Sequence, residues 1–156
     1  MRITQYKTIL NAEKHCELVK ERALNYSVDG NLNSPDKIYK MLCDVFQHNK
    51  QSEEYVYLLC LNIKCKLLGV FELSHGNVNA SVCNTREIFQ KALLCNASNI
   101  VLAHNHPSGD TTPSKNDIKI YKKIKEAANI MNVPLIDNLI VGDTCYSFME
   151  NGILTT

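Results

Sequence analysis

The sequence has few of the features that mark fibrous, disulfide-linked or strongly charged proteins. It contains no tryptophan and only four prolines and six glycines in 156 residues. Its 17 basic and 16 acidic side chains leave a formal net charge of +1. A charge this small gives no basic field of the kind that drives binding to phosphate groups. The lysines between residues 119 and 125 are interpreted as the solvated face of a helix.

Cysteine usage and hydrophobic runs exclude further classes. The seven cysteines include no CxxC pair, so neither a zinc ribbon nor a redox dithiol is indicated. No signal peptide opens the sequence, and no apolar run is longer than YVYLLCL at residues 55–61. We therefore expect a protein of the reducing cytoplasm, with no membrane segment and with most cysteines acting as small core residues.

The remaining composition is that of one globular domain. With 45% hydrophobic residues, the chain is long enough for one core and too short for two ordinary domains. Helical and strand patterns alternate along it, which predicts a mixed sheet with helices on both faces. The expected helices cover residues 11–26, 34–49, 86–96 and 113–131, with Thr85 as the cap of the third. The expected strands cover 53–62, 66–79, 99–103, 133–143 and 144–152.

One stretch, NIVLAHNHPSGDTTPSKND at residues 99–117, holds most of the polar residues that suggest chemistry. It begins as a buried strand, continues as a polar loop and ends in a helix. Because alternate side chains of a strand share a face, His104 and His106 are expected to point to the same place. Asp110 and Thr111 are interpreted as turn residues with no chemical role.

The start of the following helix is set by its proline. Thr112 is interpreted as the N-cap and Pro113 as the first helical residue, where the missing N–H costs nothing. Ser114 and Asp117 then share a helix face beside an apolar stripe. The same two residues can also imitate a capping box, but the position of Pro113 disfavours this.

Two imidazoles and one carboxylate are a common ligand set for catalytic zinc, and they leave a fourth coordination position for water. The sequence therefore predicts that His104, His106 and Asp117 bind one zinc ion. The alternative is that the histidines are strand-end residues that only bond to backbone. A zinc site of this kind also needs a base, and glutamate is suitable. The candidates are Glu53, Glu54, Glu72 and Glu87, of which Glu54 is attractive because it borders the most apolar strand.

Taken together, Glu54 before a strand, HNHPSG at 104–109 and SKND at 114–117 resemble the JAB/JAMM (MPN) metalloprotease signature. More narrowly, EEYVYLLCLN, GNVNASVCNTREIFQKAL, AHNHPSGDTTPSKND and LIDNLIVGD are similar to the bacterial RadC-like JAB domain. The resemblance covers residues 34–152. It leaves residues 1–33 as an N-terminal helical extension.

The resemblance implies a fold, a reaction and a set of roles. The fold would be α/β, a three-layer α/β/α sandwich with a mixed sheet similar to cytidine deaminase. His104, His106 and Asp117 match the zinc ligands of the family, and Glu54 matches its general acid/base. Ser114 matches the serine that helps to hold the oxyanion. The implied activity is that of a zinc-dependent metallopeptidase or isopeptidase acting on a peptide or protein substrate.

Two departures from the family pattern keep other functions open. RadC-like proteins commonly carry a helix-hairpin-helix region before this domain, and residues 1–33 lack its hairpins, so a link to DNA is not supported. Asn138 stands where the family usually has histidine, which can alter a substrate contact without removing the metal ligands. The alternatives are a nucleic-acid-acting protein of DNA repair or mobile elements and a non-catalytic zinc-containing binding module. Residues 74–84 and 107–113 are the candidate specificity loops.

Overall fold

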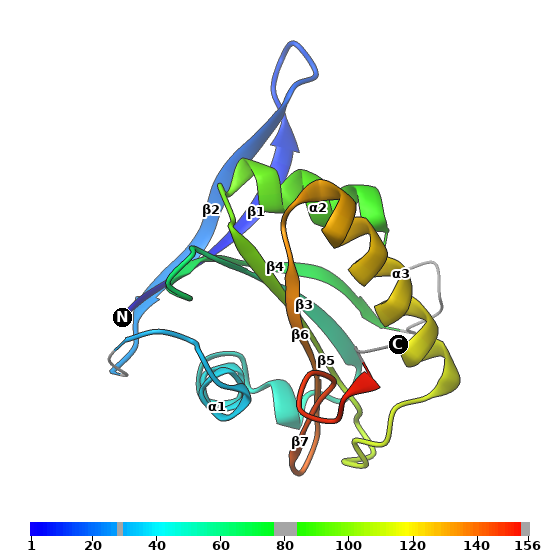
Figure 1. The fold of residues 1–156 in the computed structure, drawn as a ribbon. Coiled ribbons are helices and arrows are strands. Elements are labelled where there is room, and N and C mark those ends of the chain that lie inside the picture. The colour runs from blue at the N-terminus through cyan, green and yellow to red at the C-terminus, as the bar shows by residue number, and fades with distance from the viewer. Residues whose placement is uncertain (28–29, 77–83, 154–156) are drawn as a thin grey trace.

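The computed structural model describes residues 1–27, 30–76 and 84–153, which form a single mixed sheet with helices on both sides (Figure 1). In these residues the helical elements are α1 (Pro35–Phe46), the short 3-10 helix η1 (His48–Lys50), α2 (Thr85–Leu94) and α3 (Lys115–Met131). The strands are β1 (Arg2–Leu10), β2 (Cys16–Asn25), β3 (Glu54–Leu61), β4 (Leu67–Gly76), β5 (Asn99–Asn105), β6 (Leu135–Val141) and β7 (Cys145–Ser147).

The seven strands follow the order β2-β1-β4-β3-β5-β6-β7 across the sheet. The β1–β4 and β5–β6 pairs are parallel, and the other four pairs are antiparallel. β3 and β4 form the expected hairpin, closed by the Asn62 carboxamide, which accepts hydrogen bonds from the N–H groups of Lys64 and Lys66. The central strands β3 and β5 are nearly all buried, as a sheet covered on both faces requires.

Each face of the sheet has its own core, which confirms the predicted three-layer α/β/α sandwich. Helix α1 covers one face and packs against inward side chains such as Tyr57, Leu59 and Val101. Helices α2 and α3 cover the other face and pack against Leu58, Leu102 and their neighbours. Figure 1 shows α1 on the opposite side of the sheet from α2 and α3. The alternation of strand side chains places His104 on the α2–α3 side, with Leu102.

The helix predicted over residues 11–26 is wrong. The segment instead forms the long β1–β2 hairpin, with nine residue pairs from Arg2↔Asn25 to Leu10↔Cys16 (Figure 1). Asn11 makes the turn, since its side-chain oxygen accepts bonds from the N–H groups of Glu13 and His15. Pairing with β1 outweighs the helix propensity of the residues in β2. Their charged side chains suit a strand at the exposed edge of a sheet.

Strands β1 and β2, within the first 33 residues, join the sheet. β1 pairs with β4 through Gln5↔Val70 and Tyr6↔Phe71, and the side chains of Ile3 and Leu32 are buried in the core on the α1 side. The extension is therefore built from strands, although its separation from residues 34–152 as a distinct unit stays a prediction.

One smaller expectation also needs correction. Helix α2 is capped by Asn84, whose side chain accepts a bond from Arg86 N–H, and Thr85 is its first residue. Among the six cysteines in the described residues, only Cys60 is fully buried, and four others are partly buried against the two cores: Cys43, Cys65, Cys95 and Cys145. Cys83 lies outside the described residues, as does most of the candidate specificity loop at 74–84. No helix of the described residues is long and apolar enough to cross a membrane.

Candidate metal centre

The two histidines are positioned by the end of β5. His104 is the penultimate residue of β5, pairs with Val56 of β3 and with Ile140 of β6, and is 8% exposed. His106 follows the strand, and its N–H donates to the carbonyl of Val141. Both imidazoles therefore start from backbone that is bonded to β6. Their Nε2 atoms lie 3.3 Å apart, which confirms that the two rings point to one place.

The loop that follows is held by its own polar groups and by the β6–β7 turn. The carboxylate of Asp110 accepts bonds from both the N–H and the hydroxyl of Thr112. The carbonyl of Gly109 accepts a bond from Asp143 N–H. Gly109 has a φ of +84°, and a Cβ added there would lie 2.6 Å from a carboxylate oxygen of Asp143, so only glycine fits. The loop is thus anchored before it reaches α3.

Helix α3 begins two residues later than predicted. Its N-cap is Ser114, whose Oγ accepts a bond from Asp117 N–H, while Asp117 Oδ2 accepts one from Ser114 N–H at 2.8 Å. This is a capping box, so the placement of the cap at Thr112 and of Pro113 inside the helix is wrong. The reason is that the Thr112 hydroxyl donates to Asp110. Pro113 therefore precedes the cap as extended chain.

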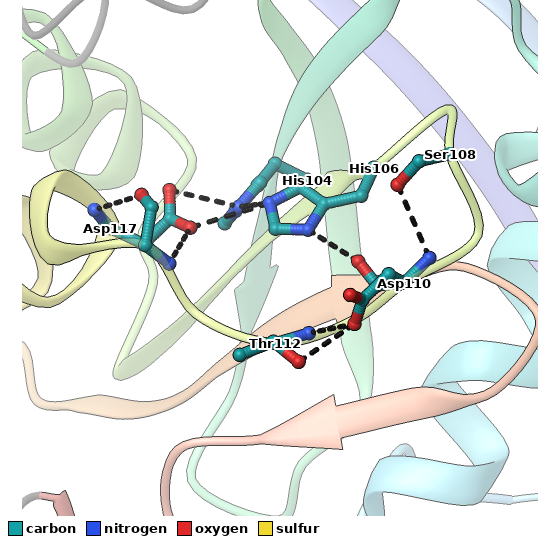
Figure 2. A network of polar contacts seen from close by, with 7 residues as sticks. His104, His106, Ser108, Asp110, Thr112 and Asp117 are labelled. Atoms are coloured by element: carbon teal, nitrogen blue, oxygen red, sulfur yellow. Dashed lines mark hydrogen bonds and ion pairs between the residues drawn. The ribbon is translucent and has the colours of Figure 1, made fainter.

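The capping box aims Asp117 at the histidines (Figure 2). Asp117 Oδ1 lies 3.3 Å from His104 Nε2, and Asp117 Oδ2 lies 3.3 Å from His106 Nε2. One ligand atom from each of the three residues lies within 4.8 Å of the other two. The carboxylate is 7% exposed, so the cluster is largely withdrawn from solvent. The structure brings together all three residues predicted to hold the metal.

The spacing and the tautomer of the cluster fit a small cation with tetrahedral coordination. A tetrahedron with metal–nitrogen bonds of about 2.0 Å has edges of about 3.3 Å, which is the separation of the two Nε2 atoms. The two imidazoles face different oxygens of Asp117, and one ligand atom from each of the three residues lies within 4.8 Å of the others. His106 Nδ1 lies 2.8 Å from the carbonyl of Asp110, to which it can only donate. This bond leaves the lone pair of a neutral imidazole on Nε2, the atom that faces the cluster.

Electrostatics keep the carboxylate charged. Burial by itself would raise the pKa of Asp117, but the hydrogen bonds to His104 and His106 hold it well below its usual value. The bond to Asp117 raises the pKa of His106 above its usual value, against the effect of desolvation. A cation that replaces the imidazole proton would meet an ionised carboxylate, as metal binding requires.

Glu54 is the glutamate that the fold places on the same face. It is the first residue of β3, two before Val56, which is paired with His104. Strand alternation therefore puts its side chain on the side of the histidines. Its charge contributes to the raised pKa of His106, and the residue is half-buried.

The other candidate bases are engaged or remote. Glu53 is exposed, and its carbonyl accepts a bond from Asn105. Glu72 accepts a bond from His75, and Glu87 is exposed in the first turn of α2. The geometry therefore favours Glu54.

Two residues that matter at the site carry weak sequence signals. Asp110 is predicted to be only a turn residue, yet its carbonyl orients His106. The sequence signal is an aspartate two residues before a threonine, which favours the turn that points this carbonyl towards His106. Asn105 belongs to the HNHPSG motif, but its side chain faces away from the two histidines, so the motif does not indicate its role. Asn138 lies in β6 beside Leu102, and is not one of the residues in the cluster.

Comparison with known proteins decides the family. The model of the RadC-like JAB domain matches residues 32–153. The chain belongs to the RadC-like JAB domain family. A UPF0758 protein of Caldanaerobacter subterraneus subsp. tengcongensis is 37% identical over 119 residues, 76% of this chain and 48% of the relative. UPF0758 proteins of Haemophilus influenzae and Clostridium perfringens are 42% and 36% identical over 79% and 89% of this chain.

The chain of this RadC-like JAB domain is shorter than those relatives. It spans 48%, 55% and 61% of their lengths, so a large part of each relative lies outside the match. The matched part nevertheless includes β3, β5 and the start of α3. The candidate metal centre therefore lies wholly within the family domain.

Proposed function

We propose that this RadC-like JAB domain is a zinc-dependent hydrolase that cleaves peptide or isopeptide bonds. The observation that carries the proposal is the convergence of His104, His106 and Asp117, with three separations of 3.3 Å and one half-buried glutamate on the same face. Two imidazoles and one carboxylate leave one position of a tetrahedral ion for a reactant, which is typical of catalytic zinc sites.

Zinc, when bound, would polarise the scissile carbonyl and make water acidic enough to react near neutral pH. The residues of the chain would hold the ion and move the protons. His106 is oriented by the Asp110 carbonyl, and Asp117 by the capping box, so these ligands need little rearrangement. Their fixed orientation favours one geometry of attack.

Glu54 would move the protons. Its carboxylate takes a proton from the attacking water and later donates it to the leaving amine, so the group ends the cycle ionised, as it began.

Ser114 is the expected oxyanion donor. Its bond from Asp117 N–H uses an acceptor lone pair of the hydroxyl and does not consume the O–H donor. The hydroxyl is therefore chemically able both to cap α3 and to donate to an oxyanion, and these two roles can be tested separately.

Metal content is the first test. We expect one equivalent of zinc in the purified protein by mass spectrometry and its loss in the double variant His104→Ala and His106→Ala. His15→Ala is the matched control, since His15 is an exposed histidine in the β1–β2 turn. No zinc in the wild-type protein, even after reconstitution, would refute the proposal.

Hydrolysis is the second test. With a library of peptides and isopeptides, we expect Glu54→Gln to keep the zinc and to lower turnover by about 10²-fold or more. Glu53→Gln is the control at the neighbouring exposed position. Equal turnover by Glu54→Gln and wild-type protein would remove Glu54 from the mechanism. Zinc binding without hydrolysis of any substrate would favour the binding-module alternative.

A further inference from the structure

The β3–β5 ladder stops just before the metal centre. Val56↔His104 is its last pair, and His106, the first residue after β5, donates its N–H to the carbonyl of Val141 in β6. The backbone around Glu54 therefore has no strand partner on the β5 side. A strand end without such partners would fray, because its N–H and C=O groups would exchange their bonds with water.

The side chain of Asn105 replaces the missing ladder. Its Oδ1 accepts a bond from Tyr55 N–H at 2.7 Å, and its Nδ2 donates to the carbonyl of Glu53 at 2.9 Å. These two backbone groups lie on either side of Glu54. Asn105 is 1% exposed, so water does not compete for either bond. The carboxamide thus holds the backbone of Glu54 from both directions.

A buried histidine completes the same clamp. His48 Nε2 lies 3.0 Å from the carbonyl of Tyr55, to which it can only donate, and His48 is 0% exposed. The ring is fixed by an edge-to-face contact with Tyr57 at 4.9 Å. Three backbone groups beside Glu54 are thus satisfied by side chains from η1 and β5 that lie on the far face of the sheet from the metal centre.

The arrangement links the two halves of the site. Asn105 stands between His104 and His106 in the chain, so the backbone of β5 positions all three residues. The carboxamide of Asn105 then fixes the backbone beside Glu54 relative to the imidazoles. We propose that Asn105 is a positioning residue that holds Glu54 over the His104, His106 and Asp117 cluster. The inference rests on the proposed function, because it gives Glu54 a role beside the metal.

A positioning role of Asn105 can be distinguished from a general stabilising role by a control substitution in the same strand. Asn99, at the other end of β5, makes a similar bond from its Nδ2 to the backbone carbonyl of Asn62, at 3.4 Å. Asn99→Ala removes a carboxamide from the same strand without touching the backbone of Glu54. It is therefore the matched control for Asn105→Ala.

The experiment uses Co²⁺ as the probe, because its visible absorption reports the groups around the ion and needs no turnover. Wild-type protein, Asn99→Ala, Asn105→Ala, Glu54→Gln and the double variant Asn105→Ala with Glu54→Gln are loaded with one equivalent of Co²⁺. We expect Asn105→Ala to bind Co²⁺ with an affinity within a few-fold of wild type and to reproduce the spectral change of Glu54→Gln. The double variant should match Glu54→Gln alone, and Asn99→Ala should match wild type.

The outcomes separate the inference from the proposed function. A wild-type spectrum for Asn105→Ala overturns the inference, and so does an additional change in the double variant, because Asn105 would then act by another route. A Glu54→Gln spectrum identical to wild type also overturns it, since no effect of Glu54 remains to be transmitted. If the spectra behave as expected but no peptide is ever hydrolysed, the positioning role stands and the proposed peptidase function fails.

Where hydrolysis is found, the same variants give a kinetic check. Asn105→Ala should lower kcat by about 10²-fold, as loss of general acid–base catalysis does, with little change in KM. In the Glu54→Gln background the same substitution should change kcat by no more than a few-fold.

Discussion

The capping box at Ser114 and Asp117 allows helix stability and metal binding to be separated by two substitutions. Ser114→Ala removes the acceptor of Asp117 N–H, which lies 3.0 Å from the hydroxyl, and leaves the carboxylate of Asp117 in place. Asp117→Asn does the reverse, because an amide oxygen can still accept the 2.8 Å bond from Ser114 N–H but is a poor ligand for zinc.

The expected magnitudes follow from these bonds. Loss of a serine N-cap costs about 1 kcal/mol of unfolding free energy. For a chain of this length that corresponds to a decrease of about 3 °C in Tm. Ser114→Ala should therefore lower the Tm of the metal-free protein by this amount and keep one equivalent of zinc. Asp117→Asn should keep the helix cap but bind zinc at least about 100-fold more weakly.

The assay combines calorimetry of the metal-free proteins with zinc competition against a chromophoric chelator. Ser114→Thr is the control, since threonine also caps helices. An unchanged Tm for Ser114→Ala would refute the capping box as a stabilising element. Wild-type zinc affinity for Asp117→Asn would show that the carboxylate is not a ligand. A large decrease in turnover for Ser114→Ala, with zinc retained, would support the oxyanion role.

Two further predictions concern the groups around the site. Burial lowers the pKa of His48 from 6.5 to about 4, so the unfolded chain binds the extra proton first. The contribution of His48 to the unfolding free energy of the metal-free protein should therefore fall by about 2 kcal/mol from pH 7 to pH 5. Denaturant titrations of wild-type protein and His48→Gln at both pH values should differ by this amount. The prediction fails if both proteins show the same slope. A Cβ added at Gly142 would lie 2.5 Å from the carbonyl oxygen of Gly109. Gly142→Ala should therefore displace the loop that contains Gly109, lower the free energy of unfolding by about 1–3 kcal/mol and weaken zinc binding. Unchanged zinc affinity would contradict the anchoring of this loop by the β6–β7 turn.

The central part of the fold could be read from the sequence because its patterns are strong. β3 and β5 are long apolar runs bordered by polar residues, and α1 has a clear proline and serine start. Strand alternation predicted that His104 and His106 point to one place, and the residue types of a zinc site added Asp117, although the predicted start of its helix was two residues early. Local periodicity is sufficient there, because all three residues belong to one strand–loop–helix segment.

The errors arose where a partner outside the local sequence decides the structure. The residues of β2 are good helix formers, and only pairing with β1 makes them a strand. The cap of α3 was misplaced because the Thr112 hydroxyl bonds to Asp110, a competition that residue preferences do not report. The role of Asn105 depends on contacts with residues about 50 positions earlier, which no motif contains.

The dependence of His106 on β6 has a consequence for the order of events during synthesis. The three candidate ligands, Glu54 and Asn105 all leave the ribosome before Val141 and Asp143, whose backbone groups bond to His106 and its loop. A nascent chain that ends before β6 therefore carries every side chain of the site but lacks the frame that aligns them. If the proposed metal site is correct, capture of the ion in the final geometry would await completion of the last strands, and a bound ion would mark a finished domain.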